Sequence, residues 1–476
     1  MTNQALQDTQ GETYMSQEEQ TNVASNGTNA RIDVYLENHW NEIVSDIQSL
    51  VKIPSYLNKD SATHDAPFGQ GPQAALNCAL EIASRMGFET HNLDGYIGYA
   101  DFPAQAPYKK HKQLGIIGHV DVVDAGPGWN FPAYDVTRKD GYLIGRGVID
   151  DKGPIIVALH ALKFWKDSNA KFPHDIRIIF GASEETGMND IPYYQKHFQD
   201  PDFLFTPDAE FPVCYGEKGH FDGRFIAGPF PNGQLISLEA GTAPNAVPGF
   251  ARATFLHDGK EVQLETQGKN AHASTPSLGI SALGILADQL LQQNAGTKEE
   301  QQFLQFLSDA APCFDGSIYD AACEDADFGS LTGVLGTSTT ENGQFTVTLD
   351  VRYPTTTNAD ALTASCQAIA SKYGICFEAT GDDKPFLLDP NSPAVTALLD
   401  AYNEATGEDA KAFTMGGGTY ARKFKNAASF GPDKPWVKNP DWVGTMHGPN
   451  EGVSEELLKE AFRIYVLTIE KLMASL

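Results

Sequence analysis

Residues 114–123 read Leu-Gly-Ile-Ile-Gly-His-Val-Asp-Val-Val, and residues 145–154 read Gly-Arg-Gly-Val-Ile-Asp-Asp-Lys-Gly-Pro. The apolar residues that open the first segment predict a short buried strand. His119 and Asp121 follow at its carboxyl end, the edge at which open α/β sheets bind ligands. Because residues i and i+2 of an extended segment point the same way, the Asp121 carboxylate can hold one nitrogen of His119 and leave the other for a metal.

Two adjacent acids, Asp150 and Asp151, stand directly before an apolar run at residues 155–165 that predicts a helix. Acids in this position often cap the N-terminus of a helix. A lone histidine such as His119 is likewise more often structural than functional. From these two segments alone, the acids and the histidine could be either structural residues or ligands of a metal site.

Further acids and a histidine downstream favour the metal site. Strand-like runs at residues 176–180 and 203–207 each lead into acids, and residues 444–450 read Gly-Thr-Met-His-Gly-Pro-Asn. Nitrogen and oxygen ligands without thiolates suit zinc, with manganese or cobalt as alternatives. The candidate ligands are His119, Asp150, Glu185, Asp208 and His447.

Longer motifs carry a resemblance to a known family. They are Thr-Pro-Asp-Ala-Glu-Phe-Pro at 206–212, Gly-Glu-Lys-Gly at 216–219 and Gly-Gly-Gly-Thr-Tyr-Ala-Arg at 416–422. With the ligand segments, they resemble the dizinc metallopeptidase family of carnosinases, aminoacylases, carboxypeptidase G and succinyl-diaminopimelate desuccinylase. The PepV-type bacterial dipeptidases are the most similar branch, and the resemblance extends from about residue 31 to the end of the chain.

The resemblance implies a role for each ligand. Asp150 would bridge two zinc ions, and its peptide bond to Asp151 would be cis. His119 and Asp208 would complete one metal site, and Glu185 and His447 the other. Two Zn²⁺ and three carboxylates leave one positive charge for a bridging hydroxide. Glu184 would then be the general base that takes a proton from the water that forms this hydroxide. Asp121 would hold a metal ligand in place without binding the metal itself.

Residues of an inserted segment would face the same site. By resemblance, His272 would stabilise the oxyanion of the tetrahedral intermediate, and Asn245 and Arg352 would bind substrate. The loop that contains Gly417, Gly418 and Thr419 would contact the substrate carboxylate through backbone N–H groups. Each of these residues could instead be an ordinary surface residue, and Arg422 could simply pair with a structural acid.

The alternation of strands and helices predicts an α/β catalytic domain with a mainly parallel, helix-covered sheet. From residue 220 the pattern changes to alternating strands and two helices, which predicts an inserted α+β lid of about 170 residues. We expect a disordered tail at 1–30, a discontinuous catalytic domain at 31–219 and 387–476, and the lid at 220–386. An insert of this length is expected to replace the partner subunit of dimeric relatives, so we predict a monomer.

Composition excludes some classes of partner. The net charge of −28 argues against nucleic acid and anionic membrane surfaces. The six cysteines form no Cys-x-x-Cys motif, and neither a signal peptide nor a membrane-spanning run is evident, which predicts a cytoplasmic protein.

The sequence therefore predicts a zinc-dependent dipeptidase that hydrolyses unblocked dipeptides. An N-acyl-amino-acid deacylase or desuccinylase on the same scaffold is the alternative activity, and comparing the two substrate types distinguishes them. A non-catalytic, metal-stabilised binding protein is a third hypothesis. It predicts loss of Glu184 or of a ligand, and all of them are present.

Overall fold

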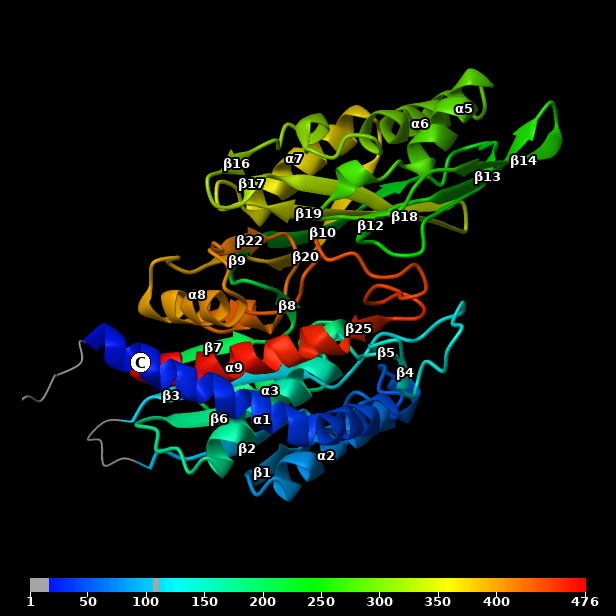
Figure 1. The fold of residues 1–476 in the computed structure, drawn as a ribbon. Coiled ribbons are helices and arrows are strands. Elements are labelled where there is room, and N and C mark those ends of the chain that lie inside the picture. The colour runs from blue at the N-terminus through cyan, green and yellow to red at the C-terminus, as the bar shows by residue number, and fades with distance from the viewer. Residues whose placement is uncertain (1–16, 106–110) are drawn as a thin grey trace, which may run out of the picture.

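Two β-sheets organise the chain in the computed structural model, which describes residues 17–105 and 111–476 (Figure 1). The nine-stranded sheet has the order β1-β2-β6-β3-β7-β23-β9-β21, with β22 pairing with β9. Its strands are β1 (Glu89–Leu93), β2 (Ile97–Phe102), β3 (Gln113–His119), β6 (Asp175–Gly181), β7 (Phe203–Thr206), β9 (Cys214–Glu217), β21 (Phe386–Leu387), β22 (Phe413–Met415) and β23 (Ala427–Ser429).

The centre of this sheet is parallel, as β6, β3, β7 and β23 pair in that order in one direction. The pairs toward both edges are antiparallel, except that β22 runs parallel to β9. The predicted α/β class is confirmed, but the sheet is parallel mainly at its centre. Its central strands are nearly fully buried, which explains their continuous apolar sequences.

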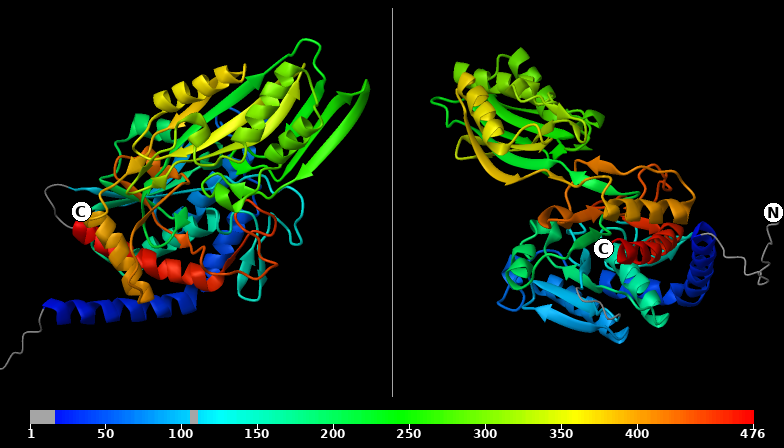
Figure 2. Two further views of the ribbon diagram at one scale, coloured as in Figure 1. Left: turned by 90° about the horizontal axis from the view of Figure 1, so that it is seen from above. Right: turned by 90° about the vertical axis from the view of Figure 1, so that its left-hand side faces the viewer.

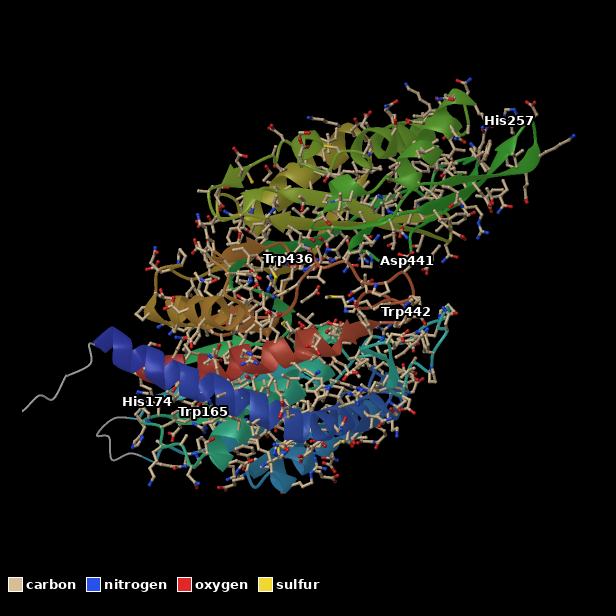
Figure 3. The ribbon with its side chains drawn as sticks, in the orientation of Figure 1. Trp165, His174, His257, Trp436, Asp441 and Trp442 are labelled. Atoms are coloured by element: carbon tan, nitrogen blue, oxygen red, sulfur yellow. The ribbon has the colours of Figure 1, made fainter. Side chains whose placement is uncertain are left out.

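Helices cover this sheet. They are α1 (Gln17–Val51), α2 (Gln70–Arg85), α3 (Lys152–Asp167), α4 (Ile191–His197), α8 (Pro393–Thr406) and α9 (Glu455–Ser475). Helix α3 packs between the sheet and α9, and Trp165 of α3, labelled in Figure 3, donates its indole N–H to the carbonyl of Val466 at 3.0 Å. Ile43, Ile47 and Leu50 form part of the fully buried face of α1.

The start of α1 corrects the predicted tail. Residues 1–16 lie outside the described residues, but residues 17–30 form the first turns of the helix, so the predicted boundary at residue 30 is wrong. The segment is polar and rich in Gln, Glu, Thr and Asn, and this composition suggested disorder. Gln and Glu nevertheless have helix propensities close to that of Leu, so a polar segment can continue a helix whose later turns are packed.

The second sheet is antiparallel and seven-stranded, in the order β14-β13-β11-β18-β19-β10-β20. Its strands are β10 (Gly219–Ala227), β11 (Leu235–Ala240), β13 (Phe250–His257), β14 (Lys260–Gln267), β18 (Thr332–Glu341), β19 (Gln344–Tyr353) and β20 (Cys376–Asp383). Helices α5 (Ala282–Gln292), α6 (Lys298–Ala310) and α7 (Ala359–Lys372) cover the face that points away from the first sheet (Figures 1 and 2).

Between β10 and β20 the chain stays in this second body, and β21 returns it to the first sheet by pairing with β9. We therefore propose a catalytic domain that begins within α1 and comprises the residues up to 219 together with 387–476, and a lid at 220–386; the start expected at residue 31 falls inside that helix. Each body has its own apolar core.

Short strands complete the fold. They are β4 (Thr137–Lys139), β5 (Tyr142–Ile144) and β25 (Gly452–Ser454) in one sheet, and the pairs β8 (Ala209–Glu210) with β24 (Pro432–Asp433), β12 (Ala246–Val247) with β15 (Ala271–His272), and β16 (Glu324–Asp325) with β17 (Gly329–Ser330). Single 3₁₀ turns lie at Lys59–Ser61, Glu184–Thr186, Pro276–Leu278, Ser317–Tyr319 and Tyr420–Lys423. No helix within the described ranges is long and apolar enough to cross a membrane.

A buried polar cluster ties three helices together. The Asp46 side chain of α1 is 3% exposed, and it accepts hydrogen bonds from His160 Nε2 of α3 at 3.0 Å and from the Arg85 guanidinium of α2. Burial lowers the pKa of His160, although its bond to Asp46 opposes the shift. The pKa of Asp46 is lowered too, because its bonds to His160 and Arg85 outweigh burial.

We predict that Asp46→Ala lowers the free energy of unfolding by about 1–3 kcal/mol, because it leaves the His160 donor buried without a partner. Chemical denaturation measures the effect. The control is Asp167→Asn, which removes an exposed pair with Lys163 and should change stability by less than about 1 kcal/mol. Equal effects of the two substitutions would contradict a stabilising role for the buried cluster.

Candidate active site

Asp150 lies at the centre of two clusters of metal-ligand residues. One is His119, Asp150 and Asp208, and the other is Asp150, Glu185 and His447; within each, one ligand atom per residue lies within 4.8 Å of the others. His119 Nε2 is 2.9 Å from Asp150 Oδ1, and His447 Nε2 is 2.8 Å from Asp150 Oδ2. The two oxygens of one carboxylate thus face two different histidines, which is the arrangement expected of a bridging ligand.

The outer carboxylates complete the two clusters. Asp208 Oδ2 lies 3.6 Å from His119 Nε2, and Glu185 Oε2 lies 3.3 Å from His447 Nε2. The five residues predicted as ligands are therefore brought together from segments far apart in the sequence.

Parallel pairing explains this convergence. His119 is the last residue of β3 and lies opposite Gly181, the last residue of β6. Strand β7 continues the same edge, and Asp208 follows it. Glu185 lies just beyond β6, in the turn at Glu184–Thr186. The carboxyl ends of three neighbouring strands thus supply three ligands, as expected for an open α/β sheet.

Asp150 and Asp151 stand just before α3, and the peptide bond between them is cis, as the resemblance implied. The interpretation of this pair as a helix cap is wrong, because Asp151 at the N-cap makes no side-chain capping bond. Asp151 Oδ2 instead accepts the backbone N–H of His119 at 3.1 Å. Its Oδ1 is buried without a partner among the described residues.

Asp121 supports the site in a different way from that predicted. His119 Nδ1 is 3.0 Å from the backbone carbonyl of Asp121 and 3.5 Å from its carboxylate, so the carbonyl rather than the side chain holds the imidazole. The Asp121 carboxylate instead accepts the backbone N–H groups of Glu184 and Glu185, each at 3.2 Å. Asp121 therefore fixes both the histidine and the turn that carries the proposed base.

The donor set fits the divalent ions that the sequence suggested. It has two imidazole nitrogens, three carboxylates and no thiolate, which suits zinc, manganese or cobalt. Burial, with repulsion from Asp150 and Glu185, raises the pKa of Asp208 to about 7. Hydrogen bonds to Asp150 and Glu185 raise the pKa of His447 to about 11, against the effect of burial. Bound cations would neutralise this crowded group of acids.

Glu184 lies beside the clusters. Burial, followed by repulsion from Asp208, raises its pKa well above the ordinary value. A buried carboxyl group with a raised pKa holds a proton more readily, which suits a group that takes a proton and later returns it.

The lid places His272 over the site. Its Nδ1 accepts the backbone N–H of Ser274 at 3.2 Å and lies 2.8 Å from the hydroxyl of the same serine. A neutral ring that accepts at Nδ1 carries its proton at Nε2. Burial and the nearby Arg352 lower the pKa of His272, which favours this neutral form.

A cavity of about 510 Å³ opens between His272 and His447. The lid contributes most of its lining, including Val247 and Pro248, and Thr445 and Met446 come from the loop of His447. Asn245 stands next to this lining, where its backbone carbonyl accepts the N–H of Ala273 at 2.9 Å. His272 thus lines the cavity, and Asn245 adjoins lining residues in the sequence.

Arg352 links the lid to the glycine loop. Its guanidinium donates to both oxygens of Asp350, at 2.8 and 3.0 Å, and to the carbonyl of Gly416 at 3.3 Å. A Cβ on Gly416 would lie 2.8 Å from the Cβ of Ser274, so only glycine allows the lid to come this close. Gly417 and Gly418 follow on this loop, where the carbonyl of Gly417 accepts from Arg422 at 3.2 Å.

Thr419 forms its hydrogen bonds within the protein. Its backbone N–H and its hydroxyl both donate to the buried carboxylate of Glu217, at 3.2 and 2.7 Å. Both donors are engaged by Glu217, so the predicted contact of Thr419 with a substrate carboxylate has no support in this structure and stays a prediction. Arg422 donates to the same Glu217 at 2.8 Å, in agreement with the structural pairing considered from the sequence.

Three supporting residues were not singled out from the sequence. Glu217 stands in the Gly-Glu-Lys-Gly motif, and Asp350 precedes Arg352 by two residues on β19, so the two share a face of the sheet. That alternation could have identified Asp350. The contact of Ser274 with the imidazole of His272 could not be derived without the geometry of the loop.

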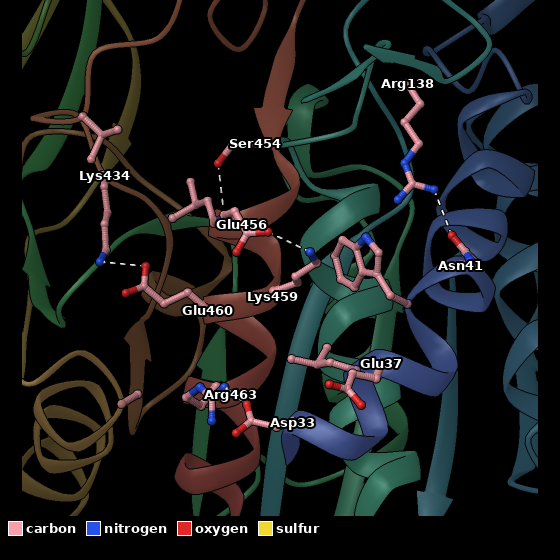
Figure 4. A pocket seen from close by; sticks show the side chains of 15 residues that line it. Asp33, Glu37, Asn41, Arg138, Lys434, Ser454, Glu456, Lys459, Glu460 and Arg463 are labelled. Atoms are coloured by element: carbon pink, nitrogen blue, oxygen red, sulfur yellow. Dashed lines mark hydrogen bonds and ion pairs between the residues drawn. The ribbon is translucent and has the colours of Figure 1, made fainter. Parts of the chain in front are cut away.

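A larger cavity, of about 1020 Å³, lies elsewhere, between α1 and α9 (Figure 4). Its lining pairs opposite charges, as in Lys434 with Glu460 at 2.8 Å and Lys459 with Glu456 at 2.7 Å. It includes no residue of the two clusters. The convergence of ligands, rather than the size of a cavity, therefore locates the active site.

Comparison with known proteins identifies the family of the chain. Residues 115–471 match the model of peptidase family M20/M25/M40. The chain is 32% identical to the Beta-Ala-Xaa dipeptidase of Lactobacillus delbrueckii over 466 residues, which cover 90% of this chain and 96% of that protein.

Solved structures share the fold. Human carnosine dipeptidase 1 aligns with a TM-score of 0.60 at 15% identity, over 94% of this chain and 99% of that one. The dipeptidase Dug1p of Saccharomyces cerevisiae aligns with a TM-score of 0.59 at 14% identity, over 94% and 98%. Since the family match spans most of the chain and the ligand clusters lie within it, the protein belongs to peptidase family M20/M25/M40 and is a metallopeptidase.

Proposed function

We propose that the protein is a zinc-dependent dipeptidase that hydrolyses unblocked dipeptides. The observation that carries the proposal is the sharing of Asp150 between two histidine–carboxylate clusters, with Glu184 beside them and His272 facing them from the lid. The 32% identity to a Beta-Ala-Xaa dipeptidase along nearly the whole chain supports the same substrate class.

His119 and Asp208 would hold one zinc ion, Glu185 and His447 the other, and Asp150 both. When bound, two such ions would polarise the scissile carbonyl and lower the pKa of water. Manganese or cobalt could occupy the same donor set.

The residues of the chain would move the proton and bind the developing charge. Glu184 would take a proton from the attacking water and return it to the leaving amine, for which its raised pKa is suited. The Nε2–H of His272 would donate to the oxygen of the tetrahedral intermediate. Because Ser274 holds Nδ1 as an acceptor, this donor is oriented before the substrate binds.

Contacts at the other end of the cleft would select a short substrate. Arg352 retains donor capacity beyond its bonds to Asp350 and Gly416, and the backbone of Gly417 and Gly418 lies on the same loop. We propose that these groups, with Asn245, bind the substrate and its terminal carboxylate. We infer that a peptide held between them and the metal clusters is two residues long.

An N-acyl-amino-acid deacylase or desuccinylase remains the alternative, because the same ligands and base would serve it. The small-peptide preference, a monomeric state and a cytoplasmic location are proposals of the same kind. The large lid supports the monomer, and sedimentation at assay concentrations would measure it.

Metal removal tests the ligand assignment. We predict that a chelator abolishes hydrolysis and that Zn²⁺, Mn²⁺ or Co²⁺ restores it, with two ions per chain by elemental analysis. Hydrolysis by protein that contains no transition metal would contradict the assignment.

The assignment of the base predicts that Glu184→Gln lowers kcat by about 10²–10⁴-fold with unchanged metal content, because glutamine keeps the shape but cannot accept the proton. Asp150→Asn should instead lose metal. Glu378→Gln, which changes an exposed glutamate of the lid, is the inert control. Near-normal turnover of Glu184→Gln would mean that another residue is the base.

The proposed contacts predict a preference for dipeptides over tripeptides in kcat/KM of more than tenfold, because loss of a charge-assisted contact costs about 2–5 kcal/mol. N-acetylated dipeptides should be poor substrates. His272→Ala should lower kcat more than it raises KM, since the oxyanion forms only near the transition state. His257→Ala, at the far end of the lid (Figure 3), is the control. Efficient cleavage of tetrapeptides or a preference for N-acyl amino acids would favour the alternative activity.

A further inference from the structure

The two histidine ligands are held in different ways. The His119 side chain is 0% exposed and ends a central strand of the sheet, whereas that of His447 is 52% exposed. His447 lies in the loop between residues 444 and 452 and has a φ of 62°, in the left-handed region. Packing thus fixes His119, while the position of His447 depends on what holds its backbone.

Arg146 holds that backbone from inside the protein. Its side chain is 1% exposed, and its Nη2 donates to the carbonyl of His447 at 3.1 Å. Its Nη1 donates to the carboxylate of Glu451, which is itself fully buried. The ring of Trp129 covers the guanidinium at 5.3 Å. A buried, charge-assisted ion pair therefore lies directly beneath the loop that carries the ligand.

Glu451 connects this pair to the segment that carries Asp150. Its Oε1 accepts the backbone N–H groups of Gly147 at 2.9 Å and Ile149 at 3.2 Å, and Ile149 immediately precedes Asp150. The backbone carbonyl of Glu451 also accepts the N–H of Gly145. The backbones on either side of the His447–Asp150 contact are thus bound to one Arg–Glu pair.

We propose that Arg146 and Glu451 are positioning residues that set the separation of His447 from Asp150, and so the affinity of the metal site that His447 completes. The proposal rests on the two-metal function above. The other site shares Asp150 and is expected to change much less, because its remaining ligands, His119 and Asp208, lie at the ends of β3 and β7, which pair directly in the sheet. Loss of a group that orients a metal ligand typically weakens metal binding about 10–100-fold.

Zinc titration of the full-length protein, stripped of metal, tests the proposal. A competing chelator of known affinity yields the dissociation constants of the two sites. Arg146→Lys keeps a positive charge beside Glu451. Its single terminal nitrogen cannot replace the two guanidinium nitrogens that donate separately to Glu451 and to His447. We expect one of the two dissociation constants to rise about 10–100-fold while the other changes less than about threefold.

The matched control is Arg177→Lys. Arg177 is also a mostly buried arginine of the same domain and donates to both oxygens of Asp101, at 2.7 and 2.8 Å, but it contacts no ligand loop among the described residues. Both of its zinc sites should keep wild-type affinity. Circular dichroism establishes that each variant is folded.

A second variant tests the proposal if Arg146→Lys does not fold. Glu451→Gln keeps a carbonyl oxygen for Gly147 and Ile149 but removes the charge that faces Arg146, so it should show a smaller loss confined to the same site. Unchanged affinities, or equal weakening of both sites in a folded variant, would overturn the proposal. A wild-type protein that binds fewer than two zinc ions would instead contradict the proposed function itself.

Discussion

Asp150 presents one carboxylate oxygen to each of two histidines, at 2.9 and 2.8 Å, and the rest of the active site is arranged around that sharing. Asp208 and Glu185 add two further carboxylates within a few ångströms, in a largely buried region. Such a concentration of acids is unfavourable unless cations compensate it. The pKa values of Asp208 and Glu184 are raised because burial and the neighbouring acids disfavour their charged forms.

The fold meets this constraint by supplying the ligands from rigid elements. Parallel pairing brings the ends of β3, β6 and β7 to one edge, and the Asp121 carboxylate then ties the turn of Glu184 to the strand of His119. His447 comes from a loop, and there the buried pair of Arg146 and Glu451 binds the backbone. On the opposite side, Arg352 and Ser274 bring the lid against Gly416, so that groups from both domains face one cleft.

The sequence was most informative where a local pattern determines the structure. Alternation of apolar strands with candidate ligand residues predicted the edge at the end of β3, near which the structure brings the five candidate ligands together. It failed where the structure depends on hydrogen bonds between distant segments. Asp121 holds His119 by its backbone rather than its side chain, and the hydroxyl of Thr419 donates to Glu217. The polar composition of residues 17–30 predicts a tail, but the helix propensities of Gln and Glu allow the first turns of α1 that the structure has there.

The central claim is that Asp150 bridges two metal ions in one site. Anomalous diffraction at the zinc edge, from crystals of zinc-loaded protein, tests it most directly. We predict two peaks about 3.5–4 Å apart, one between His119 and Asp208 and the other between Glu185 and His447, with one oxygen of Asp150 on each. A single peak, or two ions that do not share Asp150, would contradict the account.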